Sequence, residues 1–310
     1  MSILKNKSII VVGTVRNVET IITSEISRCY KALSNFKSVY FYLVESDSND
    51  RTLLVLENLK NTLKNFNFKS LGKLETKIPD RLERIRFCRN DYVHFIRSLE
   101  IETSPNYVMV ADLDGMNSAL KSNSVDSCFT RNDWDAVVAN QTFGYYDILA
   151  LRHPNWQVND WTEEFKTRKD LIIKHKASTL IDNFKYFIEL EKLKQQVLYS
   201  KMIRIRKTSP WIQIDSGFGG NAIYKTEVFL KHDYTKEFDT KETDHVSLHR
   251  KIVRDGGSVY INPKFINSHF NTYNINKFYT VRVIRNFIWS QDFLYNSSIY
   301  KAIKKLFRLL

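Results

Sequence analysis

Short apolar runs that end in polar residues alternate with longer stretches of helical spacing through the first half of the sequence. The apolar runs cover residues 9–13, 39–44, 107–111 and 134–139, and the helical stretches cover 18–36, 52–65 and 81–99. A continuous apolar run is typical of a strand that is buried on both faces. The alternation therefore predicts an α/β fold with a mainly parallel sheet and right-handed crossovers. Ligands of such sheets bind at the carboxyl ends of the strands, so the polar residues after each run form the candidate site.

The second half of the sequence departs from this alternation. Residues 162–206 form a long charged stretch without Gly or Pro, which predicts an inserted pair of helices outside the sheet. A further strand is expected at 258–261, and the segment from 273 onward is basic and helical in pattern. Because no internal repeat or linker is visible, we expect one domain over residues 1–272, including the insertion, followed by a helical tail over 273–310.

Composition excludes several classes of protein. With 43% hydrophobic and 13% aromatic residues, a chain of 310 residues can bury a real core, so disordered and low-complexity classes are excluded. Cys29, Cys88 and Cys128 lie far apart in no CxxC pattern, which supports neither a disulfide framework nor a zinc site. The apolar runs are all shorter than a signal-peptide core or a membrane span, so we expect a cytoplasmic protein.

The formal net charge of +13 indicates a polyanionic partner: nucleic acid, anionic lipid or a phosphorylated small molecule. Between residues 299 and 310, apolar side chains recur at helical spacing and basic side chains fall largely outside that stripe. This pattern predicts an interfacial helix that holds the protein peripherally at the inner face of an anionic membrane. The alternative is a terminal helix that packs on the core or on a second subunit, so an oligomer is possible.

The sharpest local signal is the pair Asp112 and Asp114, which follows an apolar strand directly and precedes Gly115. In an extended chain alternate side chains share a face, so the two carboxylates can converge on one point. Two carboxylates beside a diphosphate suit Mn²⁺ or Mg²⁺. The ion would neutralise the charge that develops on a departing nucleotide diphosphate. The alternative is a solvated turn, because this spacing is common by chance.

Two further segments carry possible chemistry. In Glu242-Thr-Asp244-His-Val-Ser-Leu-His-Arg250, an acidic loop leads into a helix, and Asp244 is either a helix N-cap or a base that faces a sugar acceptor. In Asp215-Ser-Gly-Phe-Gly-Gly, three glycines allow a ligand to approach the backbone closely, although an ordinary tight loop has the same composition.

Together these segments resemble the glycosyltransferases of the GT-A fold. VGTVRN resembles the first nucleotide-binding strand and loop, VESDSND the acidic end of the second strand, and VADLDG the DxD motif. RIRFCRNDY, WDAVVANQTFGYYDILALRH and ETDHVSLHRKIVRDGGSVYINP look closest to the cryptococcal capsular mannosyltransferase-like family and its bacterial relatives. The resemblance spans residues 9–269 without the charged insertion. ETDH also looks like the acidic-pair-then-helix motif of the large inverting bacterial transferase family, but this sequence has Thr243 where that family often has an acid.

The resemblance implies a GT-A (Rossmann-like) nucleotide-sugar-binding fold and an enzyme of the hexosyltransferase type. The implied reaction moves a sugar from a UDP- or GDP-sugar donor to a glycan or lipid-linked glycan acceptor. The implied context is the synthesis of a surface polysaccharide, such as capsule, O-antigen or lipopolysaccharide.

The resemblance also implies a role for individual residues. Asp112 and Asp114 would hold the metal and the diphosphate, and His269 would be a third metal ligand unless it is structural. Asp244 would be the catalytic base, and Asp215 with the glycine loop would shape the sugar and acceptor site. The residues implied to bind the donor nucleotide, through its nucleoside or its phosphates, are Thr14, Arg16, Glu45, Arg84 and Arg89.

Two rival interpretations come from other classes. A catalytically silent glycan-binding or scaffold protein would share the fold, although the intact DxD and ETDH segments favour an enzyme. A basic nucleic-acid-binding protein would explain the charge. Since no recognised binding motif appears and the acidic clusters would repel a phosphate backbone, we expect no nucleic-acid partner.

Overall fold

The computed structural model describes residues 3–100, 104–172, 180–236, 242–269, 273, 279–280 and 282–283. The strands are β1 (Ser8–Val15), β2 (Ser38–Glu45), β3 (Phe66–Ser70), β4 (Tyr107–Ala111), β5 (Ala136–Gln141), β6 (Ile212–Ile214), β7 (Asn221–Lys225) and β8 (Val259–Ser268). The α-helices are α1 (Ile22–Ala32), α2 (Thr52–Thr62), α3 (Arg81–Arg97), α4 (Ser122–Asp126), α5 (Trp161–Ile172), α6 (Leu180–Val197), α7 (Thr226–Phe229) and α8 (Asp244–Arg254). Three short 3₁₀ turns are η1 (Ile3–Asn6), η2 (Ser127–Phe129) and η3 (Tyr199–Lys201).

The eight strands form one sheet in the order β3-β2-β1-β4-β7-β5-β8-β6. The β1–β2, β1–β4, β2–β3 and β5–β8 pairs are parallel, whereas β7 runs antiparallel to both its neighbours and β6 runs antiparallel to β8. The predicted α/β class with a mainly parallel sheet is therefore confirmed. The antiparallel strands β6 and β7 depart from the expected crossovers. After β5 the chain passes through the α5–α6 pair before it enters β6, which runs in the opposite direction to β8.

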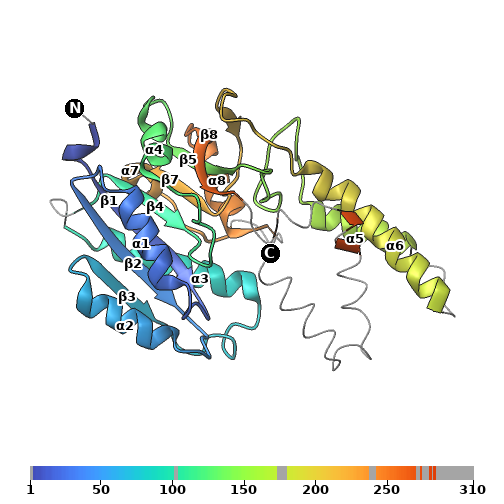
Figure 1. Cartoon of the computed structure of the whole chain (residues 1–310), viewed down its shortest axis with the longest axis horizontal. Helices are drawn as coiled ribbons and strands as arrows, with labels where there is room; N and C mark the ends of the chain where they lie inside the picture. Colours follow the sequence, from blue (N-terminus) through green and yellow to red (C-terminus); the bar gives the residue numbers. More distant parts are fainter. Residues whose placement is uncertain are drawn as a thin grey trace.

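Each face of the sheet is covered by helices, and alternate residues of the central strands pack on opposite faces. Ile10 and Val12 of β1 join a core cluster that includes the apolar residues of α3 and α8. Ile9 and Val11 join a second cluster with residues of α1, α2 and α4. Burial on both faces explains why these strands read as continuous apolar runs. Figure 1 shows this α/β body and the α5–α6 pair extending away from it.

The helix pair expected in residues 162–206 is confirmed as α5 and α6, which contact each other. The tail expected over 273–310 lies outside the described residues, except at positions 273, 279, 280, 282 and 283. One of these, Arg282, is fully buried, and its Nε lies 2.6 Å from Oε2 of Glu191 in α6. In the described part of the chain, no helix is long and apolar enough to cross a membrane.

Two helix starts provide a matched test of local stability. Asp80 caps α3, because its Oδ1 accepts a hydrogen bond from the Glu83 N–H at 2.9 Å. Thr243 occupies the N-cap of α8 but makes no side-chain capping bond, and its buried hydroxyl has no partner in the described chain. We expect Asp80→Ala to lower the free energy of unfolding by about 1 kcal/mol, and Thr243→Ala to cause no loss. Urea denaturation of both variants measures this, and equal losses would contradict the assignment of the caps.

Candidate active site

Six strands run in the same direction, so their carboxyl ends meet at one edge of the sheet. At this edge a cavity of about 400 Å³ opens beside β1, β2 and β4. Its walls include Thr14, Arg16, Asp47, Arg81, Arg84, Cys88, Arg89, Asp112 and Asp114. The structure therefore brings six of the sequence-predicted site residues into one cavity, where the strand-end rule places ligands.

Asp112 and Asp114 follow β4 directly. The Asp112 N–H donates to Gly220 O at 2.8 Å, which fixes the strand end against the start of β7. The cavity leaves 35% of the Asp112 side chain accessible, but burial raises the pKa of this carboxyl well above 3.8, and the charge of Asp114 raises it further. Asp114 is exposed at the cavity, and its partly enclosed position also raises the pKa of its carboxyl. Two neighbouring carboxylates, one of them desolvated, are stabilised by a cation.

Arginines of α3 face this pair across the cavity. Arg81, Arg84 and Arg89 all reach the cavity from one side of the helix, since the second and third follow the first by three and eight residues. Arg84 is anchored, because its Nη1 donates to Ile78 O at 2.7 Å and Pro79 O at 2.8 Å. Arg81 is exposed at the mouth and makes no ion pair within the described ranges. The cavity thus combines carboxylates that need a cation with guanidinium groups that bind anions.

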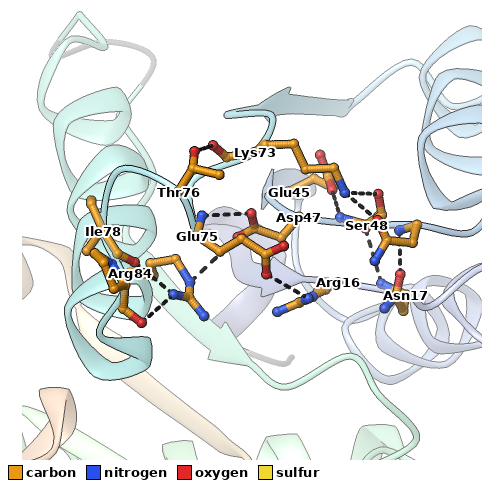
Figure 2. A network of polar contacts seen from close by, with 12 residues as sticks. Arg16, Asn17, Glu45, Asp47, Ser48, Lys73, Glu75, Thr76, Ile78 and Arg84 are labelled. Carbon is orange, nitrogen blue, oxygen red and sulfur yellow. Dashed lines mark hydrogen bonds and ion pairs between the residues drawn. The ribbon is translucent and has the colours of Figure 1, made fainter.

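A polar network forms the wall next to β1 and β2 (Figure 2). Asp47 Oδ1 accepts from the Glu75 N–H at 3.0 Å, and Arg16 Nη2 donates to Glu75 Oε2 at 3.2 Å. Glu45, predicted to reach the nucleoside, is 1% exposed and does not line the cavity. Its carboxylate is occupied by the Ser48 N–H at 2.9 Å and the Ser70 hydroxyl at 2.5 Å. Asp47, two residues later, is the acidic residue of this strand end that reaches the cavity.

A second cavity of about 380 Å³ adjoins the first and shares Arg81, Arg89 and Asp112 with it. Tyr273 also lines both cavities, and the walls of the second alone include Tyr146, Asp147, Trp161, Phe218, Thr243, Asp244 and His245. The shared residues make one continuous path from the β1–β2 edge, past Asp112, to the start of α8.

Arg89 joins Asp112 to Asp244 at the centre of this path. Its Nε lies 2.5 Å from Asp244 Oδ2, and its Nη2 lies 3.8 Å from Asp112 Oδ1. Asp244 is the first residue of α8, and Thr243 occupies the N-cap, so the alternative that Asp244 is the cap is wrong. The Asp244 side chain points to the cavity and to Arg89 instead of closing its own helix.

His245 also contacts the guanidinium group of Arg89, through a different nitrogen from the one that faces Asp244. Burial and the nearby charge of Arg89 lower the pKa of His245 well below 6.5, so the ring is neutral. Its Nε2 lies 2.6 Å from Arg89 Nη1 and accepts that N–H, while Phe218 stacks on the ring with centroids 3.7 Å apart. The Nδ1 atom then carries the proton and has no partner in the part of the chain that is described. Arg89 is fixed by charge, hydrogen bonding and ring contacts together.

The glycine loop that follows Asp215 passes closely over β5. A Cβ on Gly219, which has a φ of +65°, would lie 2.5 Å from Ala139 O, so only glycine fits this path. The loop is held by side chains: the Gly219 N–H donates to Asp147 Oδ2 at 3.1 Å, and the Phe218 N–H donates to the Tyr145 hydroxyl at 3.0 Å. The loop therefore packs against the sheet and brings its far end, Gly220, to Asp112.

Besides Glu45, two predicted site residues lie outside the path. Asp215 is exposed and lines a separate cavity of about 520 Å³ with Arg152 and Arg250, because the glycine loop lies between it and Asp112. His269 follows β8 and its Nδ1 lies 2.8 Å from Thr142 Oγ1. No group of three or more His, Cys, Asp or Glu side chains that could hold a metal occurs among the described residues. The structure thus does not assemble His269 with Asp112 and Asp114 into a three-ligand set.

Three residues of the path were missed by sequence reasoning. Sequence patterns could have identified two of them. Asp47 belongs to the acidic segment at the end of β2, and Arg81 lies three residues before Arg84 on the same helix. No such pattern marks Asp147, because it lies in an irregular loop after β5.

Comparisons with known proteins find likeness only among solved structures. No family model matches the sequence, and no curated protein matches it. The mannosyltransferase PcManGT from Pyrobaculum calidifontis, in complex with GDP-Man and Mn²⁺, is similar with a TM-score of 0.45 and 10% identity, over 90% of this chain and 65% of that one. S. aureus TarS 1-349 in complex with UDP is similar with a TM-score of 0.43 and 12% identity, over 97% of this chain and 69% of that one.

Glucosyl-3-phosphoglycerate synthase from Mycobacterium tuberculosis, in complex with UDP, is similar with a TM-score of 0.36 and 12% identity, over 85% of this chain and 69% of that one. The chain thus spans 65–69% of the length of these three structures.

Proposed function

We propose that this chain is a glycosyltransferase that moves a sugar from a nucleotide-diphosphate donor to a hydroxyl acceptor. The observation that carries the proposal is the cavity in which Asp112 and Asp114 face Arg81, Arg84 and Arg89. A nucleotide diphosphate is the ligand that needs both halves of this site. Its phosphate oxygens bind guanidinium groups directly, and they share a divalent cation with carboxylates. The sequence resemblance to GT-A glycosyltransferases supports the same assignment.

A divalent cation fits the donor set at Asp112 and Asp114. Their raised pKa values indicate two carboxylates that lack enough positive charge nearby, and among the described residues Asp112 has an ion pair with Arg89 alone. Two carboxylates together with phosphate oxygens and water are ligands that Mn²⁺ and Mg²⁺ accept. When bound, the ion would neutralise charge on the departing diphosphate. We propose these two residues as its protein ligands.

The chain's own residues supply the remaining roles. Arg81 and Arg84 bind and orient the diphosphate from the face of α3, and Arg89 stabilises negative charge beside Asp112. Asp244 lies on the acceptor side, where its carboxylate would take the proton from the attacking hydroxyl. A UDP- or GDP-sugar donor, a glycan or lipid-linked acceptor in surface polysaccharide synthesis, and docking of the basic tail on an anionic membrane are finer proposals that rest on the sequence alone.

Donor binding provides the test. We expect a UDP-, GDP- or dTDP-sugar to raise the melting temperature, and Mn²⁺ to increase the shift. A CMP-sugar, which carries a single phosphate, should not raise it. A ligand at 100 times its dissociation constant stabilises a folded protein by about 2.7 kcal/mol, which thermal unfolding detects readily. Nucleoside monophosphates serve as the control, because they lack the diphosphate. If none of the sugar nucleotides stabilises the protein, with or without Mn²⁺, the proposal is wrong. If a sugar nucleotide raises the melting temperature equally with and without Mn²⁺, only the proposed metal site is wrong.

A further inference from the structure

Asp147 is a carboxylate of the second cavity that has no role in the proposed reaction. It follows β5 in an irregular loop and is half-buried in the cavity wall. Its Oδ2 accepts the Gly219 N–H at 3.1 Å, and its Oδ1 accepts the Ala150 N–H at 3.3 Å. Each oxygen can accept a second hydrogen bond. The two backbone donors leave one acceptor site free on each oxygen, and a hydroxyl group of a ligand can fill it.

The charges around Asp147 also favour hydrogen-bond donors from a ligand at this carboxylate. Burial raises the pKa of Asp147 and the charge of Asp244 raises it further, while Arg89 and the two backbone N–H groups lower it. Arg89 is already engaged by Asp244 and His245, so it is not released to pair with Asp147. Hydrogen-bond donors from a ligand would stabilise the carboxylate that the protein leaves under-compensated.

The order of residues along the path identifies which part of the ligand lies at Asp147. Asp114 and Arg16 line only the first cavity, Asp112 and Arg89 line both, and Asp147 lines only the second. A donor whose diphosphate lies at Asp112 and whose nucleoside lies beside β1 and β2 directs its sugar into the second cavity.

The walls around Asp147 have the chemistry that binds a sugar ring. Tyr146 and Trp161 provide aromatic surface in the same cavity, whereas Phe218 is buried against His245. Tyr146 stacks on Tyr273 with ring centroids 5.0 Å apart. Aromatic faces pack against the C–H surface of a ring, and a carboxylate accepts hydrogen bonds from its hydroxyl groups.

The loop that carries Asp147 is firmly placed. Gly144 has a φ of +149°, and a Cβ there would lie 2.9 Å from Met202 O. The next residue, Tyr145, is fully buried, and its N–H donates to Ile203 O at 2.9 Å. The loop is therefore fixed between the sheet and the end of the helical insertion, as a residue that selects a substrate requires.

We propose that Asp147 binds hydroxyl groups of the sugar that is transferred, and that it thereby sets which sugar the donor carries. The inference rests on the proposed function, since it takes the first cavity as the nucleotide and diphosphate site. Asp147 is a binding residue in this proposal and takes no part in proton transfer.

Donor binding in the absence of acceptor tests the proposal. UDP-glucose and GDP-mannose, each beside UDP or GDP alone, are titrated with Mn²⁺ into the wild-type chain, Asp147→Asn and Asp147→Ala. We expect the variants to lose about 10- to 100-fold in affinity for the sugar nucleotide, the loss expected for a hydrogen bond to a charged group, while affinity for the nucleotide diphosphate is unchanged. Asp170→Asn, an exposed carboxylate on α5, is the matched control and should bind like the wild type.

Deoxyfluoro forms of the sugar nucleotide separate direct contact from support of the glycine loop. Replacing the contacted hydroxyl should weaken binding to the wild type about 10-fold and to Asp147→Asn scarcely at all. Equal penalties in both proteins would overturn the inference and leave Asp147 as a holder of Gly219. A loss confined to turnover with acceptor would assign Asp147 to the acceptor hydroxyl and also overturn it. If the wild type binds no nucleotide, the proposed function fails and the inference fails with it.

Discussion

Asp112→Asn and Asp114→Asn should each reduce sugar transfer by about 10³-fold or more while the protein remains folded. The physical reason is that an amide neither attracts a divalent cation as a carboxylate does nor balances the arginines across the cavity. The measurement is turnover of the sugar nucleotide identified by thermal unfolding, at saturating Mn²⁺. Full activity of both variants, or of the wild type in excess EDTA, would exclude a metal at this pair.

Thermal stability provides a second readout, and here we expect a gain where sugar transfer shows a loss. Burial raises the pKa of Asp112 well above 3.8, so folding favours the protonated form of this carboxyl relative to the unfolded chain. The stability that it contributes is fully present below the unfolded pKa and is lost as the pH rises through the folded pKa. In EDTA at neutral pH, Asp112→Asn should therefore unfold at a higher temperature than the wild type, and the difference should shrink as the pH falls. Asp170→Asn, exposed on α5, controls for the loss of one charge.

The sequence predicted the first cavity well because the geometry of a parallel sheet determines it. Once residues 9–13 and 107–111 are strands in one parallel sheet, the polar residues that follow them must lie at the same edge. The pattern of strands and strand ends is thus enough to group Thr14, Arg16 and Asp112. Arg84 and Arg89 of α3, which the resemblance to GT-A glycosyltransferases implied, line the same cavity.

The second cavity depends on contacts between segments far apart in the chain, which a local pattern does not reveal. The position of Asp147 is fixed by Gly144 against Met202 and by Gly219, and both contacts require knowledge of where the insertion and the glycine loop return to the sheet. The same loop explains the placement of Asp215. Local sequence puts Asp215 next to three glycines, but the loop passes over β5 and brings Gly220 to Asp112, while Asp215, at its other end, lines a separate cavity.

Asp244→Asn should cut sugar transfer by about 10²- to 10⁴-fold and preserve donor binding, if Asp244 is the base. The ion pair with Arg89 raises a competing interpretation, in which Asp244 only positions that arginine. The two differ in their readouts. Loss of a base removes the acidic limb of the pH profile of kcat and leaves the affinity for the donor unchanged. Loss of a positioning carboxylate lets Arg89 move, so the affinity for the donor falls while the acidic limb of the pH profile of kcat is retained.

Arg89 variants separate the effect of the Asp244 charge on folding stability from the role of Asp244 in sugar transfer. Arg89→Met leaves Asp244 without its cation in a site where both side chains are 8% exposed, and breaking a buried pair in this way costs about 3–5 kcal/mol of folding stability. The double variant Arg89→Met/Asp244→Asn removes the uncompensated charge, so it should recover much of that stability without recovering turnover. Chemical denaturation and transfer rates on the two single variants and the double variant measure both effects in one cycle. Near-normal turnover in Asp244→Asn would exclude Asp244 as the base, and a double variant no more stable than Arg89→Met would show that the buried charge is not what destabilises it.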